Sequence, residues 1–245
     1  MTQAEWFEDW FDSPYYHILY KYRDDSEAEG FIDHLLQTLQ PKAAAKVLDL
    51  ACGRGRYSRY LAGKGYEVCG LDLSPQSIAH ARQFERDNLS FFVHDMREPF
   101  RTDAFDYIFS FFTSFGYFDT ETEDLATLKN VRLGLKPGGM FVLDFFNSEY
   151  VRQQLTGPEQ KTIDGITFGL HKRIAGNKVV KTIRFRSREG QDYYFEERVR
   201  LMELEDFQRL FAAAGLHIVK TYGDYQLQPF DPENSPRLIV EAKPA

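Results

Sequence analysis

Cysteine is scarce in this chain of 245 residues, which contains only Cys52 and Cys69. Two cysteines are too few for a disulfide framework, and neither belongs to a CxxC pair. The sequence also lacks the paired Cys/His spacing of a zinc site. We therefore expect a protein without a metal centre that folds in a reducing compartment.

Long apolar runs are missing as well. No stretch reaches the roughly 18 apolar residues that a membrane-spanning helix requires. The first residues, MTQAEWFEDWF, are acidic and aromatic and lack the basic start and apolar core of a signal peptide. These absences predict a cytoplasmic protein without a membrane partner.

An excess of basic residues is missing too, because 30 Lys and Arg stand against 37 Asp and Glu, a formal net charge of -7. Nucleic-acid binders usually carry a basic face. The charge therefore argues against nucleic acid as a partner. We expect a small-molecule acceptor and a protein that is a monomer or homodimer. Aromatic residues are abundant, at 16% of the chain, which fits a Phe-rich core, a pocket walled by rings, or both.

The hydrophobic pattern from residue 45 to 145 alternates between short apolar runs and amphipathic stretches. Such alternation predicts βαβ units around a parallel sheet. The predicted strands are 47–50, 66–71, 89–93, 105–111 and 140–145, with a turn at Pro137-Gly138-Gly139 before the last. The predicted helices between them are 57–63, 75–86 and 122–135.

The flanking segments have other patterns. Residues 5–39 indicate two helical stretches with a break near Ser13-Pro14, and Pro41 ends the second. Residues 161–200 alternate as antiparallel strands, with turns at Gly176-Asn177 and Glu189-Gly190. A helix at 203–214 and strands at 216–225 and 237–243 complete the α/β core.

Chemically distinctive residues follow the predicted strands, where an open parallel sheet binds its ligands. The first strand carries Asp49 and leads into a turn with Gly53 and Gly55. The second ends at Asp72, whose carboxylate can accept two hydrogen bonds from a ribose diol. A nicotinamide dinucleotide fingerprint requires a third glycine where this chain has Ser58. A dehydrogenase is thus an alternative that the motif disfavours.

The ordered motifs VLDLACGRGRYS, VCGLDLS, VHDMRE, FDYIFSFFTSFGYF and KPGGMFVLDFFN resemble those of the class I S-adenosylmethionine-dependent methyltransferases. The helix ending in AAAGL and the closing RLIVEAK also match that family. The resemblance implies a Rossmann-like, doubly wound, mostly parallel seven-stranded sheet with an antiparallel last strand. It places a small antiparallel β insertion after the fifth strand.

The resemblance also implies residue roles. Asp49 and the turn of Ala51, Gly53 and Gly55 would hold the methionine part and the sugar of S-adenosyl-L-methionine. Asp72, with Leu73 beside it, would bind the ribose hydroxyls. Asp95 would contact the adenine amino group, with Met96 against the ring. Ser110 would lie near the amino-acid portion, and the acceptor would meet Phe112, Tyr117 and Asn147.

The N-terminal segment YYHILYKYRDDSEAEGF is similar to that of methyltransferases acting on small molecules, in which an N-terminal helix closes over the cofactor. Tyr16, Tyr20 and Arg23 would then face the cofactor. The chain would divide into an N-terminal helical cap (1–40), a cofactor-binding core (41–150), an antiparallel β lid (151–202) and the end of the core (203–245).

The acceptor is less defined than the cofactor, and the sequence favours a small-molecule N- or O-methyltransferase. No residue stands out as a general base, the candidates being His17, Tyr117 and His171. An RNA or protein methyltransferase on the same fold is one alternative, because the insertion carries basic positions. These are Lys172, Arg173, Lys178, Lys181, Arg184, Arg186 and Arg188. A non-catalytic protein that binds S-adenosylmethionine is another.

Overall fold

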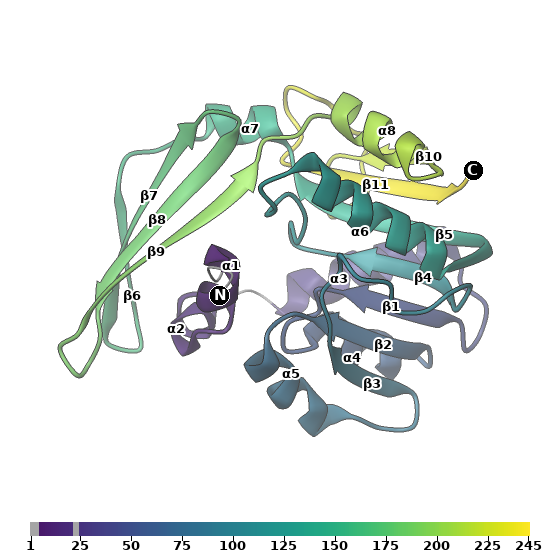
Figure 1. The fold of residues 1–245 in the computed structure, drawn as a ribbon, viewed down its shortest axis with the longest axis horizontal. Coiled ribbons are helices and arrows are strands. Elements are labelled where there is room, and N and C mark those ends of the chain that lie inside the picture. The colour runs from purple at the N-terminus through teal and green to yellow at the C-terminus, as the bar shows by residue number, and fades with distance from the viewer. Residues whose placement is uncertain (1–4, 22–24) are drawn as a thin grey trace. The chain divides into compact units, whose positions relative to one another are not determined.

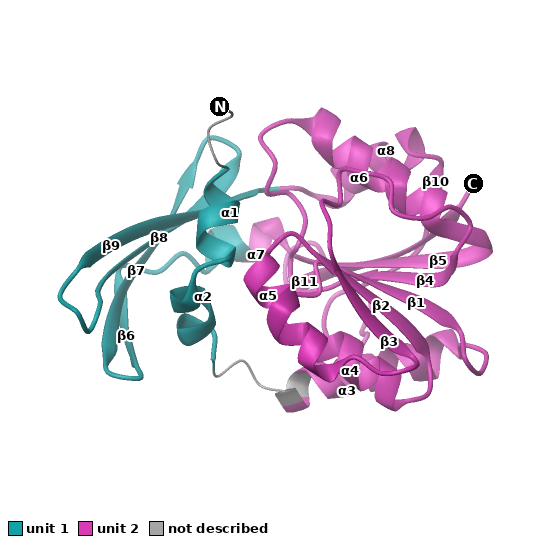
Figure 2. Ribbon diagram, turned by 60° about the horizontal axis from the view of Figure 1, so that its bottom comes forward, with its two compact units in different colours: residues 1–23, 151–201 teal, residues 24–150, 202–245 magenta. Residues whose placement is uncertain are grey.

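The computed structural model describes residues 5–21 and 25–245. The chain folds into two compact units (Figure 2). Unit 1 combines residues 1–23 with residues 151–201, and unit 2 combines residues 24–150 with residues 202–245. Each unit therefore contains segments that are far apart in the sequence.

Unit 2 is built on a seven-stranded sheet in the order β10-β11-β5-β4-β1-β2-β3. The strands are β1 (Lys46–Leu50), β2 (Glu67–Asp72), β3 (Leu89–Val93), β4 (Phe105–Ser110), β5 (Leu135–Phe146), β10 (Leu216–Tyr222) and β11 (Arg237–Pro244). Strand β11 pairs antiparallel with both β5 and β10, whereas the pairs between β5, β4, β1, β2 and β3 are parallel. The predicted mostly parallel sheet with an antiparallel last strand is confirmed.

Helices cover both faces of this sheet (Figure 1). Helices α3 (Asp25–Leu39), α4 (Arg56–Gly63) and α5 (Pro75–Ala81) lie on one face, and α6 (Glu121–Gly134) and α8 (Leu204–Ala213) lie on the other. Helix α7 (Ser148–Gln153) follows β5. The central strands β1 and β2 are buried along almost their whole length because helices cover both faces of the sheet.

Several boundaries differ from the sequence prediction. The helix expected at 75–86 ends at Ala81 and continues as a 3-10 turn, Arg82–Phe84. Strand β5 begins at Leu135, which pairs with Phe105, and the expected Pro-Gly-Gly turn is a bulge within the strand. Gly138 supplies the positive φ of 78° that this bulge needs.

Unit 1 contains a four-stranded antiparallel sheet in the order β6-β7-β8-β9. Its strands are β6 (Glu159–Ile163), β7 (Ile166–Ala175), β8 (Lys178–Arg186) and β9 (Asp192–Arg200). The short helices α1 (Trp6–Phe11) and α2 (Pro14–Leu19) pack on one face through a core that includes Trp10, Leu19 and Phe168. The predicted antiparallel insertion after the fifth strand is confirmed.

The predicted break near Ser13-Pro14 has a simple local cause. The Ser13 hydroxyl caps α2 by accepting a hydrogen bond from the Tyr15 N–H at 3.2 Å, and Pro14 occupies the first helical position. The N-terminal region forms three helices rather than two, because α2 ends at Leu19 and α3 begins at Asp25.

Candidate active site at the strand ends

The turn between β1 and α4 depends on residues with positive φ. Ala51, Gly53 and Gly55 have φ values of 62°, 56° and 76°. A Cβ at Gly55 would lie 2.5 Å from the Phe91 ring, whereas a Cβ at Gly53 would meet nothing within 4 Å. The turn thus packs against the core at Gly55 and leaves its backbone open to a ligand at Gly53.

Asp49 lies beneath this turn and is buried. Its carboxylate accepts a hydrogen bond of 2.5 Å from the hydroxyl of Ser58 on α4. Burial raises the pKa of Asp49 to about 7, and the nearby negative charge of Asp72 adds to this effect, although the Ser58 hydrogen bond opposes it. Asp49 can therefore change its charge near neutral pH.

Asp72 joins the glycine turn to the next helix. One carboxylate oxygen accepts the Gly53 N–H at 2.7 Å and the other accepts the Ser74 N–H at 2.9 Å. Ser74 in turn caps α5 by accepting from the Ser77 N–H at 3.0 Å. A carboxylate has about four acceptor positions, so Asp72 can also accept hydrogen bonds from a diol. Leu73 lies between Asp72 and Ser74 in the sequence.

Asp95 and Met96 follow β3, the next strand in the sheet. Asp95 makes an ion pair with Arg97, whose Nη2 lies 2.7 Å from Oδ2, and Arg97 also contacts Glu123 on α6 at 2.8 Å. Although burial opposes the shift, the Arg97 hydrogen bonds lower the pKa of Asp95. Arg97 lies in the motif VHDMRE but was given no role from the sequence, yet it holds the loop that carries Asp95 in place.

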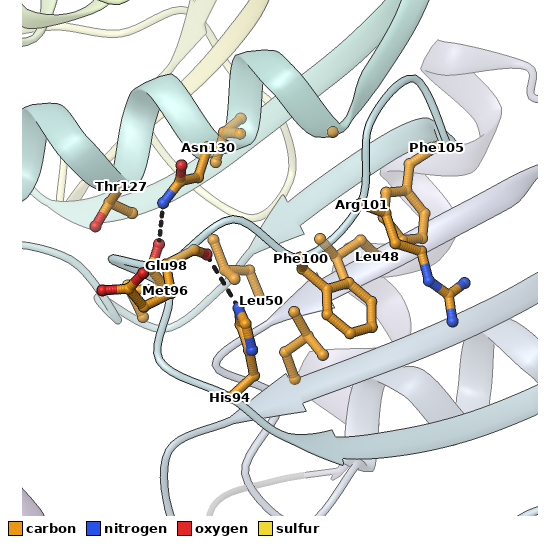
Figure 3. Close-up of a pocket in the computed structure, with 13 residues that line it drawn as sticks. Leu48, Leu50, His94, Met96, Glu98, Phe100, Arg101, Phe105, Thr127 and Asn130 are labelled. Atoms are coloured by element: carbon orange, nitrogen blue, oxygen red, sulfur yellow. Dashed lines mark hydrogen bonds between the residues drawn. The ribbon is translucent and has the colours of Figure 1, made fainter.

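A small cavity lies behind this loop, between the sheet and α6 (Figure 3). Its wall includes Leu48, His94, Met96 and Asn130, and the Asn130 amide donates to the Met96 carbonyl at 3.2 Å. The cavity measures about 20 Å³, which is room for little more than one water molecule. It is therefore too small to be the site of a nucleoside cofactor.

Strand β4 lies between β5 and β1 in the sheet, and the segment that follows it starts at this central position. Ser110 is buried at the end of β4, and Phe112 follows it half-buried. The Phe112 N–H donates to the carboxylate of Asp144 on β5 at 2.9 Å. Asp144 also pairs with Arg237 on β11 at 2.6 Å. Both residues lie in motifs noted in the sequence, Asp144 in KPGGMFVLDFFN and Arg237 in RLIVEAK, but neither motif indicated that the two would pair.

The other predicted acceptor residues of unit 2 lie in different surroundings. The Asn147 side chain is buried and donates to the carbonyls of Pro232 and Ser235, both at 2.8 Å. It therefore holds the loop before β11. Tyr117 is half-buried in the segment between β4 and α6.

Unit 1 contains the remaining candidates. Tyr16 packs against Trp10, and the Tyr20 hydroxyl donates to Glu197 at 2.6 Å and accepts from Lys181 at 2.6 Å. His17 is on α2, 5.2 Å from the Tyr16 ring. The other candidate base, His171, is exposed on β7, and Arg23 lies outside the described residues. Unit 2 alone brings together Asp49, Ala51, Gly53, Gly55, Asp72 and Leu73.

Within the described ranges 5–21 and 25–245, no group of three or more His, Cys, Asp or Glu residues is placed to hold a metal ion. Over the same ranges, no helix is both long enough and apolar enough to cross a membrane.

Comparison with known proteins gives a consistent result. The model of the methyltransferase domain family matches residues 47–139, which run from β1 into β5. A dTDP-3-amino-3,6-dideoxy-alpha-D-glucopyranose N,N-dimethyltransferase from Streptomyces fradiae is 29% identical over 206 residues, covering 75% of this chain and 74% of that protein. A dTDP-3-amino-3,4,6-trideoxy-alpha-D-glucopyranose N,N-dimethyltransferase from Streptomyces venezuelae is 26% identical and covers 79% and 83% of the two chains.

The fold has a close structural counterpart. A crystal structure of an S-adenosylmethionine-dependent methyltransferase from Clostridium acetobutylicum superposes with a TM-score of 0.80, covering 94% of this chain and 96% of that one at 20% identity. The domain match and the similar relatives thus support a methyltransferase. More specifically, the chain is an S-adenosylmethionine-dependent methyltransferase, whose residues 47–139 match the methyltransferase domain model.

Proposed function

We propose that this enzyme methylates a nitrogen or oxygen atom of a small molecule, and that the acceptor is the amine of a nucleotide-linked amino sugar. The observation that carries the proposal is the similarity to two dTDP-amino sugar N,N-dimethyltransferases over about three quarters of the chain. An amine needs only to be unprotonated to accept a methyl group, which agrees with the lack of an evident base.

The strand-end residues have the chemistry that the cofactor requires. When bound, S-adenosylmethionine supplies an electrophilic methyl group on a sulfonium. We propose that Asp72 accepts hydrogen bonds from the ribose hydroxyls, and that the open backbone at Gly53 lies against the ligand. Asp95, held by Arg97, would accept from the adenine amino group. These residues bind and orient the donor, and orientation is a large part of catalysis in such displacements.

The charge pattern of unit 1 supports a small acceptor over RNA. Arg173 and Arg198 both pair with Glu196, at 3.5 and 2.7 Å. Arg186 pairs with Asp192 at 2.7 Å. With the Lys181–Glu197 pair at 3.7 Å, acidic neighbours therefore pair with three of the seven basic positions that suggested a nucleic-acid patch. Tyr16 and Tyr20 stay predictions as cofactor contacts, and a cytoplasmic location stays a prediction as well.

The first test is calorimetric titration of the purified protein with S-adenosylmethionine and S-adenosylhomocysteine, with NAD as a control. We expect micromolar binding of the first two ligands, no binding of NAD, and loss of binding in Asp72→Ala. Binding of NAD in preference to the other ligands would mean that the role given to the glycine turn is wrong.

The acceptor is tested with methyl-labelled S-adenosylmethionine and dTDP-3-amino-3,6-dideoxyglucose, with the corresponding 3-hydroxy sugar nucleotide and total RNA as comparisons. We expect label on the amino sugar only. Transfer to RNA would favour the alternative acceptor class, and binding without transfer to any acceptor would favour a non-catalytic protein.

A further inference from the structure

The turn that follows β4 is strained. Phe112 and Thr113 have φ values of 61° and 62°, in the left-handed region. Neither residue is a glycine, and a β-branched residue such as Thr113 rarely adopts this conformation. Such positions are energetically unfavourable and persist only where the surrounding structure determines them. Contacts with the surrounding structure must therefore hold this turn in its strained conformation.

Asp144 on β5 holds both strained residues. Its carboxylate accepts the Phe112 N–H at 2.9 Å, and its main-chain carbonyl accepts the Thr113 N–H at 2.9 Å. Asp144 is fully buried, so its carboxylate has lost its hydration. A single residue of the neighbouring strand thus determines the direction of both N–H groups of the turn.

Arg237 balances the buried charge of Asp144. Its Nε donates to Oδ1 at 2.7 Å, and its Nη2 donates to the Thr113 hydroxyl at 3.0 Å. Tyr225 adds a hydrogen bond of 3.2 Å to the other carboxylate oxygen. Burial, and next the charge of Asp144, raise the pKa of the Tyr225 hydroxyl, which keeps it a donor. Removing one partner of such a pair leaves an uncompensated buried charge.

The strained turn brings the Phe112 ring beside the glycine turn. Its centroid lies 6.0 Å from that of Tyr57, the second residue of α4, and 6.3 Å from that of Tyr225. The guanidinium of Arg56 lies 5.3 Å from the Phe112 centroid and 4.8 Å from the Tyr57 centroid. These ring faces therefore already attract a cation.

We propose that Asp144 and Arg237 are positioning residues for the methyl donor. They hold the turn so that the half-buried Phe112 ring meets the positively charged sulfonium of S-adenosylmethionine next to the glycine turn. The inference rests on the S-adenosylmethionine dependence of the enzyme and is independent of the acceptor. Asp144 and Arg237 act through Phe112 and do not themselves touch the cofactor.

The test compares the affinities for S-adenosylmethionine and S-adenosylhomocysteine, measured by calorimetry. The two ligands differ in the methyl group and the positive charge on sulfur, so their affinity ratio reports on a cation–aromatic contact. Phe112→Leu is expected to lower the preference for S-adenosylmethionine by roughly 3- to 10-fold. Phe112→Tyr keeps an aromatic face and should retain the preference.

The positioning role is tested with Asp144→Asn and Arg237→Lys. Each variant should lower the affinity ratio, because the released turn no longer fixes the Phe112 ring. Combining either change with Phe112→Leu should lower the ratio no further than Phe112→Leu alone, since the residues act as one unit. If Asp144→Asn does not fold, Arg237→Lys and the Phe112 variants still decide the question.

Asp106 provides a matched control at the opposite end of β4. It forms ion pairs with Lys42 and Lys136 at 2.9 and 2.8 Å. Asp106→Asn should therefore reduce stability and leave the affinity ratio unchanged. Equal weakening of both ligands in Asp144→Asn, or an unchanged ratio in Phe112→Leu, would overturn the inference. A wild-type protein that binds neither ligand would instead contradict the cofactor itself.

Discussion

The charge of the buried Asp49 depends on pH near neutrality. Burial is the main reason that its pKa rises from 3.8 to about 7. Between these values the folded protein retains a proton that the unfolded chain has released. The free energy of unfolding that this group contributes is therefore greatest below about pH 4 and falls as the pH rises to about 7. Above that range the folded protein contains a buried, charged carboxylate.

Asp49→Asn should remove this pH dependence. An amide keeps the shape and the acceptor oxygen for Ser58 but does not ionise. We expect the variant to gain stability relative to the wild type between pH 5 and pH 8, because one pKa unit corresponds to about 1.4 kcal/mol. Urea unfolding of both proteins at pH 5 and pH 8 measures the difference in the free energy of unfolding between variant and wild type. A difference that does not change with pH would contradict the buried proton.

The two glycines of the turn should respond differently to alanine. Gly55→Ala forces a Cβ to within 2.5 Å of Phe91 at a φ of 76°, so strain and overpacking add up to about 2–5 kcal/mol of lost stability. Gly53→Ala meets no neighbouring atom within 4 Å, so only the left-handed strain of about 1–2 kcal/mol applies.

Thermal unfolding and S-adenosylmethionine titration separate these effects. Gly53→Ala should lose more cofactor affinity than its small loss of stability suggests, because its methyl group would enter the open space that we propose the cofactor fills. Equal stability losses in the two variants would contradict the packing described for Gly55.

The first turn of helix α6 contacts the loop that carries Asp95. Thr120 and Glu123 form a capping box, in which each side chain accepts a hydrogen bond from the other residue's N–H. Glu123 also contacts Arg97, the partner of Asp95. The Glu123 carboxylate thus contacts both the start of the helix and the loop that carries Asp95.

Thr120→Ala should reduce the free energy of unfolding by about 0.5–2 kcal/mol, since it removes the cap of α6. Cofactor affinity should change little, because Glu123 can keep its contact with Arg97. Chemical denaturation and calorimetry measure the two quantities. Thr120→Ser keeps the capping hydroxyl and is the matched control. It should retain at least half of the free energy of unfolding that Thr120→Ala loses.

The chain as a whole consists of two units, each made from distant segments. Trp10 ties the N-terminal helices to the insertion, because it is fully buried and its Nε1 donates to Glu197 at 2.8 Å. Its ring also packs 4.7 Å from Phe195. Residues near the start of the chain thus complete the core of a sheet formed about 150 residues later.

Trp10→Ala should destabilise unit 1 by about 3–5 kcal/mol, as expected for a large buried ring. Hydrogen exchange followed by mass spectrometry should show lost protection in residues 5–21 and 159–200, with protection kept in β1, β4 and β5. Trp10→Phe retains most of the apolar volume and should show a smaller effect. Equal loss of protection in both sheets would contradict the division into units.

Local sequence chemistry was enough for much of the fold and for part of the site. Alternating patterns, glycine turns and proline positions act over a few residues, so they predicted the strands, the antiparallel insertion and the cluster at Asp49, Gly53 and Asp72. Strands β1 and β2 are adjacent and parallel. Asp49 and the turn with Gly53 therefore lie at the same edge of the sheet as Asp72, the last residue of β2.

The tertiary structure alone decided the contacts between residues that are distant in sequence. Asp144 and Arg237 meet because β5 pairs with β11, and no local pattern encodes that register. Tyr225 reaches Asp144 from the segment between β10 and β11. The packing of α1 and α2 on the insertion likewise depends on apolar surfaces that become neighbours only when the chain folds. Burial then changed the chemistry of individual side chains, since desolvation of Asp49 raises its pKa in the folded protein only.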